Sequence, residues 1–129
     1  MSLKIVLKPD EKIIINQAVI INGKTKTEFI VENKSAILRK KDILKEEDAI
    51  TPCKGLYYLL QMAYLFPESE DINLNLAYQL IEDIKVAAPS LSAQILHISL
   101  TLNEKNFYKA LKDCQKLISV EEEILKNVC

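Results

Sequence analysis

The sequence contains very little glycine, histidine or cysteine, and each scarcity excludes a class of function. Only Gly23 and Gly55 occur among 129 residues. The Walker and dinucleotide-binding fingerprints need several glycines close together, so phosphate-cradling loops of these kinds are excluded. His97 is the single histidine, and no C-x-x-C pair is present. Because metal sites and nucleophilic active sites need such residues in groups, we expect no metal, no cofactor and no enzyme activity.

The cysteine pattern and the shortness of the apolar runs indicate in which cellular compartment the protein resides. Cys53, Cys114 and Cys129 are odd in number and widely spaced, which is typical of reduced thiols. Cys53, beside Lys54, is either a thiol of low pKa at a helix start or a small buried residue, and we favour the second. No apolar run approaches the ~18 residues of a membrane span. The first residues alternate in polarity, unlike a secretion signal. We therefore expect a soluble, cytoplasmic protein that contacts no membrane.

Charge is unevenly distributed along a chain whose formal net charge is only −1. Residues 1–55 hold 10 Lys and 1 Arg against 8 acidic residues, which gives +3. Residues 56–129 hold 6 Lys against 10 acidic residues, which gives −4. This asymmetry favours an anionic partner for the first half of the chain.

The first third of the chain has the pattern of β-structure. Leu3, Ile5 and Leu7 alternate with Lys4, Val6 and Lys8, and residues 12–21 are a β-branched run typical of a buried strand. Asn22-Gly23 is the strongest hairpin signal in the chain. Two further strands are expected, over residues 25–32 and 35–40. Residues 1–46 are therefore predicted to form a small antiparallel sheet or barrel-like meander.

The rest of the chain has the pattern of helices. Thr51-Pro52 reads as an N-cap followed by proline at the first helical position. The helix that follows, to about residue 66, is apolar nearly all round and is expected to be central. Further helices are predicted over residues 73–88, 91–102, from 106 onward, and 120–126. The fold class is therefore α+β, with a C-terminal bundle of four to five helices over residues 47–129. The segments "AYQLIEDI" and "ALKDCQKL" are weakly similar to each other and lie about 33 residues apart. This similarity leaves a tetratricopeptide-like pair of helical hairpins as the less favoured alternative.

Other polar residues have structural interpretations. His97 lies on a polar helical face and is expected to be an exposed imidazole. The acidic runs at 45–48, 67–71 and 120–123 are each expected at a helix start, where the helix dipole stabilises them.

Two groups of residues are candidates for a binding surface. The first consists of Lys34, at the turn before the fourth predicted strand, and of Arg39, Lys40 and Lys41 at the end of that strand. It either binds phosphates, or its lysines only protect a strand edge against aggregation. The second is a helical stripe of Lys54, Tyr57, Gln61 and Tyr64, which either belongs to the core or faces a nucleic acid base or a partner protein.

Four motifs in a fixed order carry a family resemblance. They are "LKPxE", "AVIxNG", "ENKxxILRxKDI" and "TPxKxxYxxxQxxYL", all within residues 1–68. Together they resemble the FlbT family of bacterial flagellar regulators. The positions that match the second pair of motifs are Asn33, Lys34, Leu38, Arg39, Lys41, Asp42, Thr51, Pro52, Lys54, Tyr57, Gln61 and Tyr64. The family resemblance implies a cation at position 55, and this chain departs from it by having Gly55 there.

The resemblance implies a regulator of flagellin synthesis that is not an enzyme. It implies binding to the 5′ untranslated region of flagellin messenger RNA and a lowered stability or translation of that RNA, although some members act positively. The alternative is an adaptor or chaperone that binds flagellin or the FlaF regulator through the helical part. The exposed sheet edges leave a homodimer open. Whether Arg39 contacts RNA or pairs with Asp42 also stays open at this point.

Overall fold

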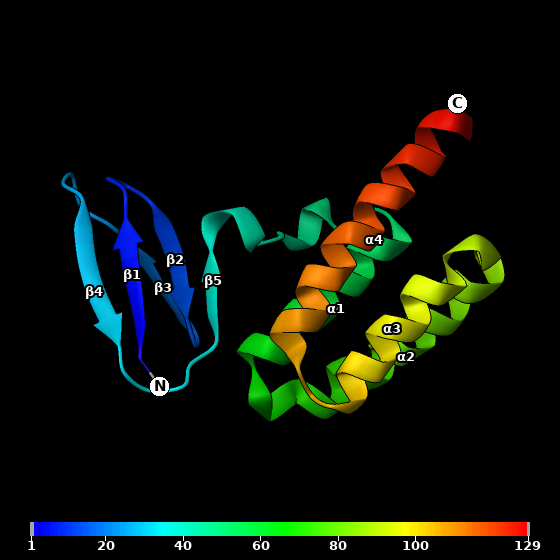
Figure 1. Cartoon of the computed structure of the whole chain (residues 1–129), viewed down its shortest axis with the longest axis horizontal. Coiled ribbons are helices and arrows are strands. Elements are labelled where there is room, and N and C mark those ends of the chain that lie inside the picture. Colours follow the sequence, from blue (N-terminus) through cyan, green and yellow to red (C-terminus); the bar gives the residue numbers. More distant parts are fainter. Residues whose placement is uncertain (1, 129) are drawn as a thin grey trace. The chain divides into compact units, whose positions relative to one another are not determined.

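Strands precede helices throughout residues 2–128, which are the part of the chain that the computed structural model describes (Figure 1). The internal contacts divide the chain into one unit over residues 1–43 and a second over residues 44–129. All β-strands belong to the first unit and all α-helices to the second. The predicted α+β class is confirmed. Cys129, one of the predicted reduced thiols, lies outside the described residues.

The first unit contains two small antiparallel sheets. Strands β1 (Leu3–Leu7) and β4 (Thr27–Val31) form one of them. The other has the order β3-β2-β5, with β2 at Lys12–Ile15, β3 at Ala18–Ile21 and β5 at Ile37–Arg39. The strands that pair are therefore not always neighbours in the sequence, because β4 returns to β1 and β5 returns to β2.

The β-branched run over residues 12–21 was predicted to be one strand. In the structure it forms a hairpin of β2 and β3 instead. Ile15 pairs with Ala18, so only Asn16 and Gln17 form the turn. Asn16 has φ 57°, a left-handed conformation that asparagine tolerates better than most residues. Its Oδ1 also accepts a hydrogen bond from Ala36 N at 3.0 Å. Asn16 thus closes one hairpin and anchors the segment that leads into β5.

Asn22-Gly23 does not form the predicted tight hairpin. Among the described residues no glycine has a positive φ, and β4 pairs with β1 instead of β3. Asn22 acts through its side chain, whose Nδ2 donates to Lys8 O at 2.8 Å and to Thr25 O at 3.0 Å. Its Oδ1 accepts from Thr27 Oγ1 at 2.7 Å. A single amide therefore joins the loop after β1 to the loop before β4.

The core of the first unit lies between the two sheets. Ile5 and Leu7 of β1 and Ile13 of β2 are buried, which confirms the predicted inward face of the first strand at these two positions. Leu3, predicted on the same face, is 51% exposed at the end of its strand. Partly buried side chains complete the cluster: Ile15, Phe29, Val31 and Ile37.

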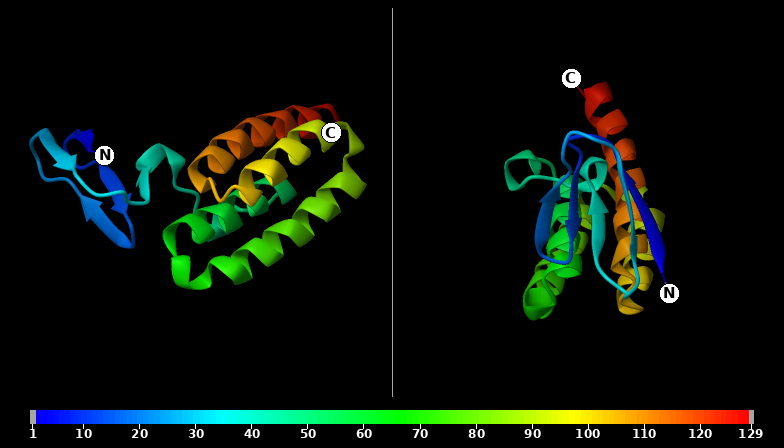
Figure 2. Two further views of the ribbon diagram at one scale, coloured as in Figure 1. Left: turned by 60° about the horizontal axis from the view of Figure 1, so that its bottom comes forward. Right: turned by 90° about the vertical axis from the view of Figure 1, so that its left-hand side faces the viewer.

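The second unit contains helices α1 (Pro52–Leu65), α2 (Glu70–Ala87), α3 (Ser92–Asn103) and α4 (Phe107–Val128) (Figure 2). Thr51 Oγ1 accepts from Lys54 N at 3.3 Å, so the predicted N-cap is confirmed. Helix α1 packs against both α2 and α4, as expected of the most apolar helix. The separate short helix predicted near the end is the last part of α4.

Glu121 is the buried carboxylate of this unit. Its side chain accepts hydrogen bonds from Thr51 Oγ1 and, at 3.0 Å, from Cys53 N, which is one of the unpaired amides at the start of α1. The acidic run at 120–123 was predicted at a helix start. It lies inside α4 instead. The carboxylate stabilises the N-terminus of a different helix, α1.

Replacing Glu121 is expected to destabilise the protein, because the buried amide of Cys53 would lose its acceptor. We expect Glu121→Ala to lower the free energy of unfolding by about 1–3 kcal/mol. Urea denaturation followed by circular dichroism measures this loss. The neighbouring Glu122 is exposed, so Glu122→Ala is the matched control and should change the free energy by less than about 0.5 kcal/mol. Equal losses in the two variants would show that Glu121 has no such role.

Candidate nucleic-acid interface

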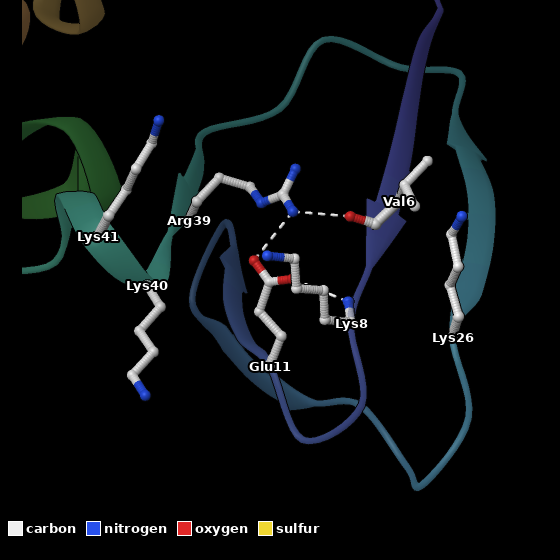
Figure 3. A pocket seen from close by; sticks show the side chains of 7 residues that line it. All are labelled: Val6, Lys8, Glu11, Lys26, Arg39, Lys40 and Lys41. Atoms are coloured by element: carbon white, nitrogen blue, oxygen red, sulfur yellow. Dashed lines mark hydrogen bonds and ion pairs between the residues drawn. The ribbon is translucent and has the colours of Figure 1, made fainter.

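A cavity of about 890 Å³ lies in the first unit, and most of the side chains that line it are cationic (Figure 3). The lining residues are Val6, Lys8, Glu11, Lys26, Arg39, Lys40 and Lys41. They come from the end of β1 and the loop that follows it, the loop before β4, and the end of β5 with its 3₁₀ turn (Lys40–Asp42). Segments that are distant in the sequence thus bring five cations to one concave surface, which we call the basic cavity.

Arg39 connects the strands around the basic cavity. One guanidinium nitrogen, Nη2, donates to Val6 O at 2.7 Å and to Glu11 Oε2 at 2.9 Å (Figure 3). Val6 belongs to the β1–β4 sheet, whereas Arg39 itself belongs to the β3-β2-β5 sheet. Arg39 therefore joins the two sheets, and its ion pair is with Glu11. Asp42, the partner considered from the sequence, is buried in the 3₁₀ turn.

Glu11, the one acidic residue of the lining, is already engaged. Lys8 N donates to its Oε1 at 2.9 Å, and Arg39 occupies its Oε2. These two interactions, first the backbone hydrogen bond and then that from Arg39, hold the pKa of Glu11 below its ordinary value of 4.5. The carboxylate is thus ionised at neutral pH and compensated by its own donors.

The four lysines of the basic cavity are exposed and available. Among the residues that the structure describes, no carboxylate forms an ion pair with Lys8, Lys26, Lys40 or Lys41. Nearby lysines of the same unit differ in this respect, because Lys4 pairs with Glu28 and Lys24 with Asp10. Unpaired ammonium groups around a concave surface are suited to bind phosphate oxygens.

Comparison with known proteins identifies the family. The family model described as "Flagellar protein FlbT" matches residues 3–125. A Rhodopseudomonas palustris protein named "Probable flagellum biosynthesis repressor protein FlbT" is 42% identical over 130 residues, which cover 98% of this chain and 100% of that protein. The "Flagellum biosynthesis repressor protein FlbT" of Caulobacter vibrioides is 35% identical over 130 residues, covering 99% and 92% of the two chains.

The chain belongs to the FlbT family. The resemblance found from its ordered motifs is therefore confirmed. The names of these FlbT proteins describe repressors of flagellum biosynthesis. No solved structure matches the chain.

The site residues predicted from the sequence of this FlbT chain do not form one surface, because some lie on the first unit and the others on the second. Arg39, Lys40 and Lys41 line the basic cavity. Lys34 is exposed in the loop between β4 and β5 but is not part of the lining. The other four predicted residues, Lys54, Tyr57, Gln61 and Tyr64, all lie on α1 in the second unit.

The predicted stripe on α1 is mostly buried, and two of its members belong to the core. Tyr57 is 3% exposed, and its hydroxyl accepts from Gln115 Nε2 at 3.3 Å. Gln61 is 2% exposed, and its amide bonds both to Leu44 N and to Leu44 O. Because buried polar groups need such partners, these contacts explain the two residues structurally. We therefore remove Tyr57 and Gln61 from the candidate surface.

The remaining stripe residues are only partly accessible. Tyr64 is half-buried, and its ring lies 6.1 Å from that of Tyr108 on α4. Lys54 is half-buried in the first turn of α1. Gly55, where the FlbT resemblance implies a cation, faces α2, since an added Cβ would lie 3.4 Å from Leu80 Cδ2.

Lys8 and Lys26 are the lining cations that the sequence analysis did not select. Leu7 pairs with Thr27 at the end of the β1–β4 ladder, so Lys8 and Lys26 come immediately beyond it on adjacent strands. No local pattern within residues 27–31 distinguishes β1 from the preceding strand as the partner of β4. Lys8 and Lys26 lie close together because β4 pairs with β1, whereas the hairpin signal at Asn22-Gly23 predicted that it would pair with the strand before it.

The other candidate groups do not form a site. His97 is an exposed imidazole, as predicted, with Nε2 3.0 Å from Asp113 Oδ2 on α4. Cys53 is buried, and burial, together with the charge of Glu121, raises the pKa of its thiol to about 12. The interpretation of Cys53 as a small buried residue is thus confirmed. Within residues 2–128 no group of His, Cys, Asp or Glu is arranged to hold a metal ion, and no helix is both long and apolar enough to cross a bilayer.

The Glu11 ion pair gives a testable pH dependence. Because the pKa of Glu11 is lower in the folded state, its ionised form stabilises the protein above pH 4.5, and this contribution is lost as the pH falls through the folded-state pKa. We expect Glu11→Gln to be less stable than the parent at pH 7 and to approach it below pH 4.5. Urea denaturation followed by the NMR signals of the β-strand amides measures this difference.

The control for that experiment is Glu28→Gln. Glu28 pairs with Lys4 at the surface, where both side chains are more than half exposed, so its replacement should have little effect at any pH. A destabilisation by Glu11→Gln that stays constant down to pH 3 would contradict the role given to the Glu11 carboxylate.

Proposed function

We propose that this FlbT protein binds the 5′ untranslated leader of flagellin messenger RNA through the basic cavity and lowers the stability or translation of that RNA in the cytoplasm. The observation that carries the proposal is the convergence of five cations on one concave surface, with their single carboxylate already compensated. Membership in a family of proteins named flagellum biosynthesis repressors supports the choice of target.

The physical basis of the proposal is electrostatic. The overall charge of −1 does not favour a polyanion, so binding must depend on where the cations lie. The lysines and the arginine of the cavity belong to the first unit, residues 1–43, in which 8 Lys and 1 Arg against 5 acidic residues give a net charge of +4. Phosphate contacts of this kind release counterions and position an RNA, and they make binding strongly dependent on salt.

The proposal predicts a difference between two lysine variants. The double variant Lys40→Ala/Lys41→Ala removes two cations of the basic cavity, whereas Lys34→Ala removes an exposed lysine of the same unit outside it. We expect the double variant to bind a flagellin leader RNA about tenfold or more weakly at ~0.1 M salt, with a shallower salt dependence. Lys34→Ala should bind within about twofold of the parent. Fluorescence anisotropy with a labelled leader measures both.

A scrambled RNA of equal length is the control for specificity in this experiment. Binding that does not change with salt, or an equal loss in Lys34→Ala and in the double variant, would count against the basic cavity as the RNA site. Absence of binding to any leader would contradict the proposed function itself.

A second candidate function is an adaptor or chaperone for flagellin or for the FlaF regulator. It is supported by exposed apolar side chains on two neighbouring helices, Ile72 and Leu76 on α2 and Leu96 and Leu100 on α3. These helices are linked by a hydrogen bond from Tyr78 Oη to Asn103 Oδ1 at 2.8 Å. A complex with flagellin or FlaF that survives nuclease treatment and is lost in Leu76→Ser/Leu96→Ser would favour this function over RNA binding.

A further inference from the structure

The basic cavity gathers cationic side chains from segments that are distant in the sequence. Five cationic side chains and one carboxylate leave a formal charge of +4 around about 890 Å³. Lys8 and Lys26 lie at the end of the β1–β4 sheet, whereas Lys40 and Lys41 lie in the 3₁₀ turn after β5, where their side chains point in opposite directions (Figure 3). A surface lined in this way is suited to an anion of high charge.

The lining offers no aromatic ring on which a nucleobase could stack. Its described members are lysines, one arginine, one glutamate and one valine. Base stacking on aromatic side chains supplies much of the affinity at sites that follow a single strand. The lysine ammonium is instead a flexible point charge that binds phosphate oxygens without regard to base identity. The four lysines of the cavity therefore favour phosphate charge over base identity.

The charge of an RNA chain is not uniform along its length. Each internal phosphodiester carries one negative charge, and successive ones are separated by a sugar. A terminal phosphate carries an additional charge, so a 5′-triphosphate bears about −4 in one compact group. This value matches the +4 of the basic cavity more closely than an internal phosphate does.

We infer that the basic cavity binds the 5′-terminal triphosphate of RNA. This inference rests on the proposed function, because it specifies which part of a leader RNA the cavity takes. Free inorganic tripolyphosphate and nucleoside triphosphates carry the same chemical group, so the shared ligand chemistry is a chain of three phosphates with a free end. Recognition of a terminus would place the protein where a leader RNA begins.

The backbone that carries Lys8 and Lys26 is held by hydrogen bonds before any anion binds. Asn22 Nδ2 bonds to Lys8 O and to Thr25 O, so it holds the segments that carry Lys8 and Lys26 beside each other. Asp10, with φ 61°, allows the sharp turn in which Glu11 N donates to Lys8 O at 3.1 Å. A backbone held in place in this way lowers the entropy that an anion must overcome on binding.

The direct experiment varies only the 5′ end of one leader RNA. The full-length protein is titrated with the same transcript carrying a 5′-triphosphate, a 5′-monophosphate or a 5′-hydroxyl, and inorganic tripolyphosphate is added as a competitor. We expect the triphosphate form to bind about tenfold or more tightly than the hydroxyl form, because several charge-assisted contacts are lost with the end group. We also expect tripolyphosphate to displace the triphosphate RNA.

The possible outcomes separate this inference from the proposed function. Equal affinity for the three ends would overturn the terminal site and leave RNA binding intact. Binding of tripolyphosphate without binding of any RNA would overturn the proposed function and the assignment to an RNA end. Binding of neither would overturn both.

Variants assign the preference to the basic cavity. Lys8→Ala/Lys26→Ala should reduce the ratio of triphosphate to hydroxyl affinity toward one, and Asn22→Ala should reduce it by displacing the same lysines. Lys24→Ala is the matched control, because Lys24 lies on the same loop but pairs with Asp10 outside the cavity. The ratio is unaffected by a general loss of folded protein, so it tests the site itself. An unchanged ratio in Lys8→Ala/Lys26→Ala would overturn the inference.

Discussion

The contact of Arg39 with Val6 and Glu11 is the interaction on which the first unit depends. It joins the two sheets through a backbone carbonyl, and it compensates the one carboxylate that faces the cavity lysines. The backbone N–H of Lys8 stabilises the ionised Glu11 together with the hydrogen bond and the charge of Arg39 and the charge of Lys8. The guanidinium stays protonated at every physiological pH and offers donors in a rigid fork, which a lysine cannot reproduce. The only arginine of the chain is therefore both a structural link and a partner of the single carboxylate in the cavity lining.

The two units divide the chemistry of the chain. The first is small and basic, and its core between the sheets consists of a few branched side chains. The second carries the acidic excess and a larger core, and its polar buried groups, such as Gln61 and Glu121, hold backbone segments in place. The basic cavity thus lies on one unit, and the exposed apolar side chains of α2 and α3 lie on the other.

The sequence predicted what local chemistry determines and missed what distant contacts determine. The Thr51 cap and the positions of the four main helices follow from neighbouring residues, and these predictions agree with the structure. Arg39, Lys40 and Lys41, which the sequence grouped together, line the same cavity. The hairpin at Asn16 was hidden because β-branched residues on both sides read as one strand. Lys8 joins the cavity only through the β1–β4 pairing. The sequence left Gln61 open between the core and a binding surface, because its partner, Leu44, lies 17 positions away. No local pattern specifies contacts of this range.

The carboxylate of Glu121 at the start of α1 also has a consequence for the order of events during synthesis. Its partner Thr51 is made 70 residues earlier, so α1 leaves the ribosome while its N-terminal amides still lack their final acceptor. Chains grow at roughly 5–20 residues per second, so this helix waits several seconds for completion. During that interval the first unit already has all of its own residues. A nascent FlbT chain therefore contains every residue of the basic cavity before its helical part is complete.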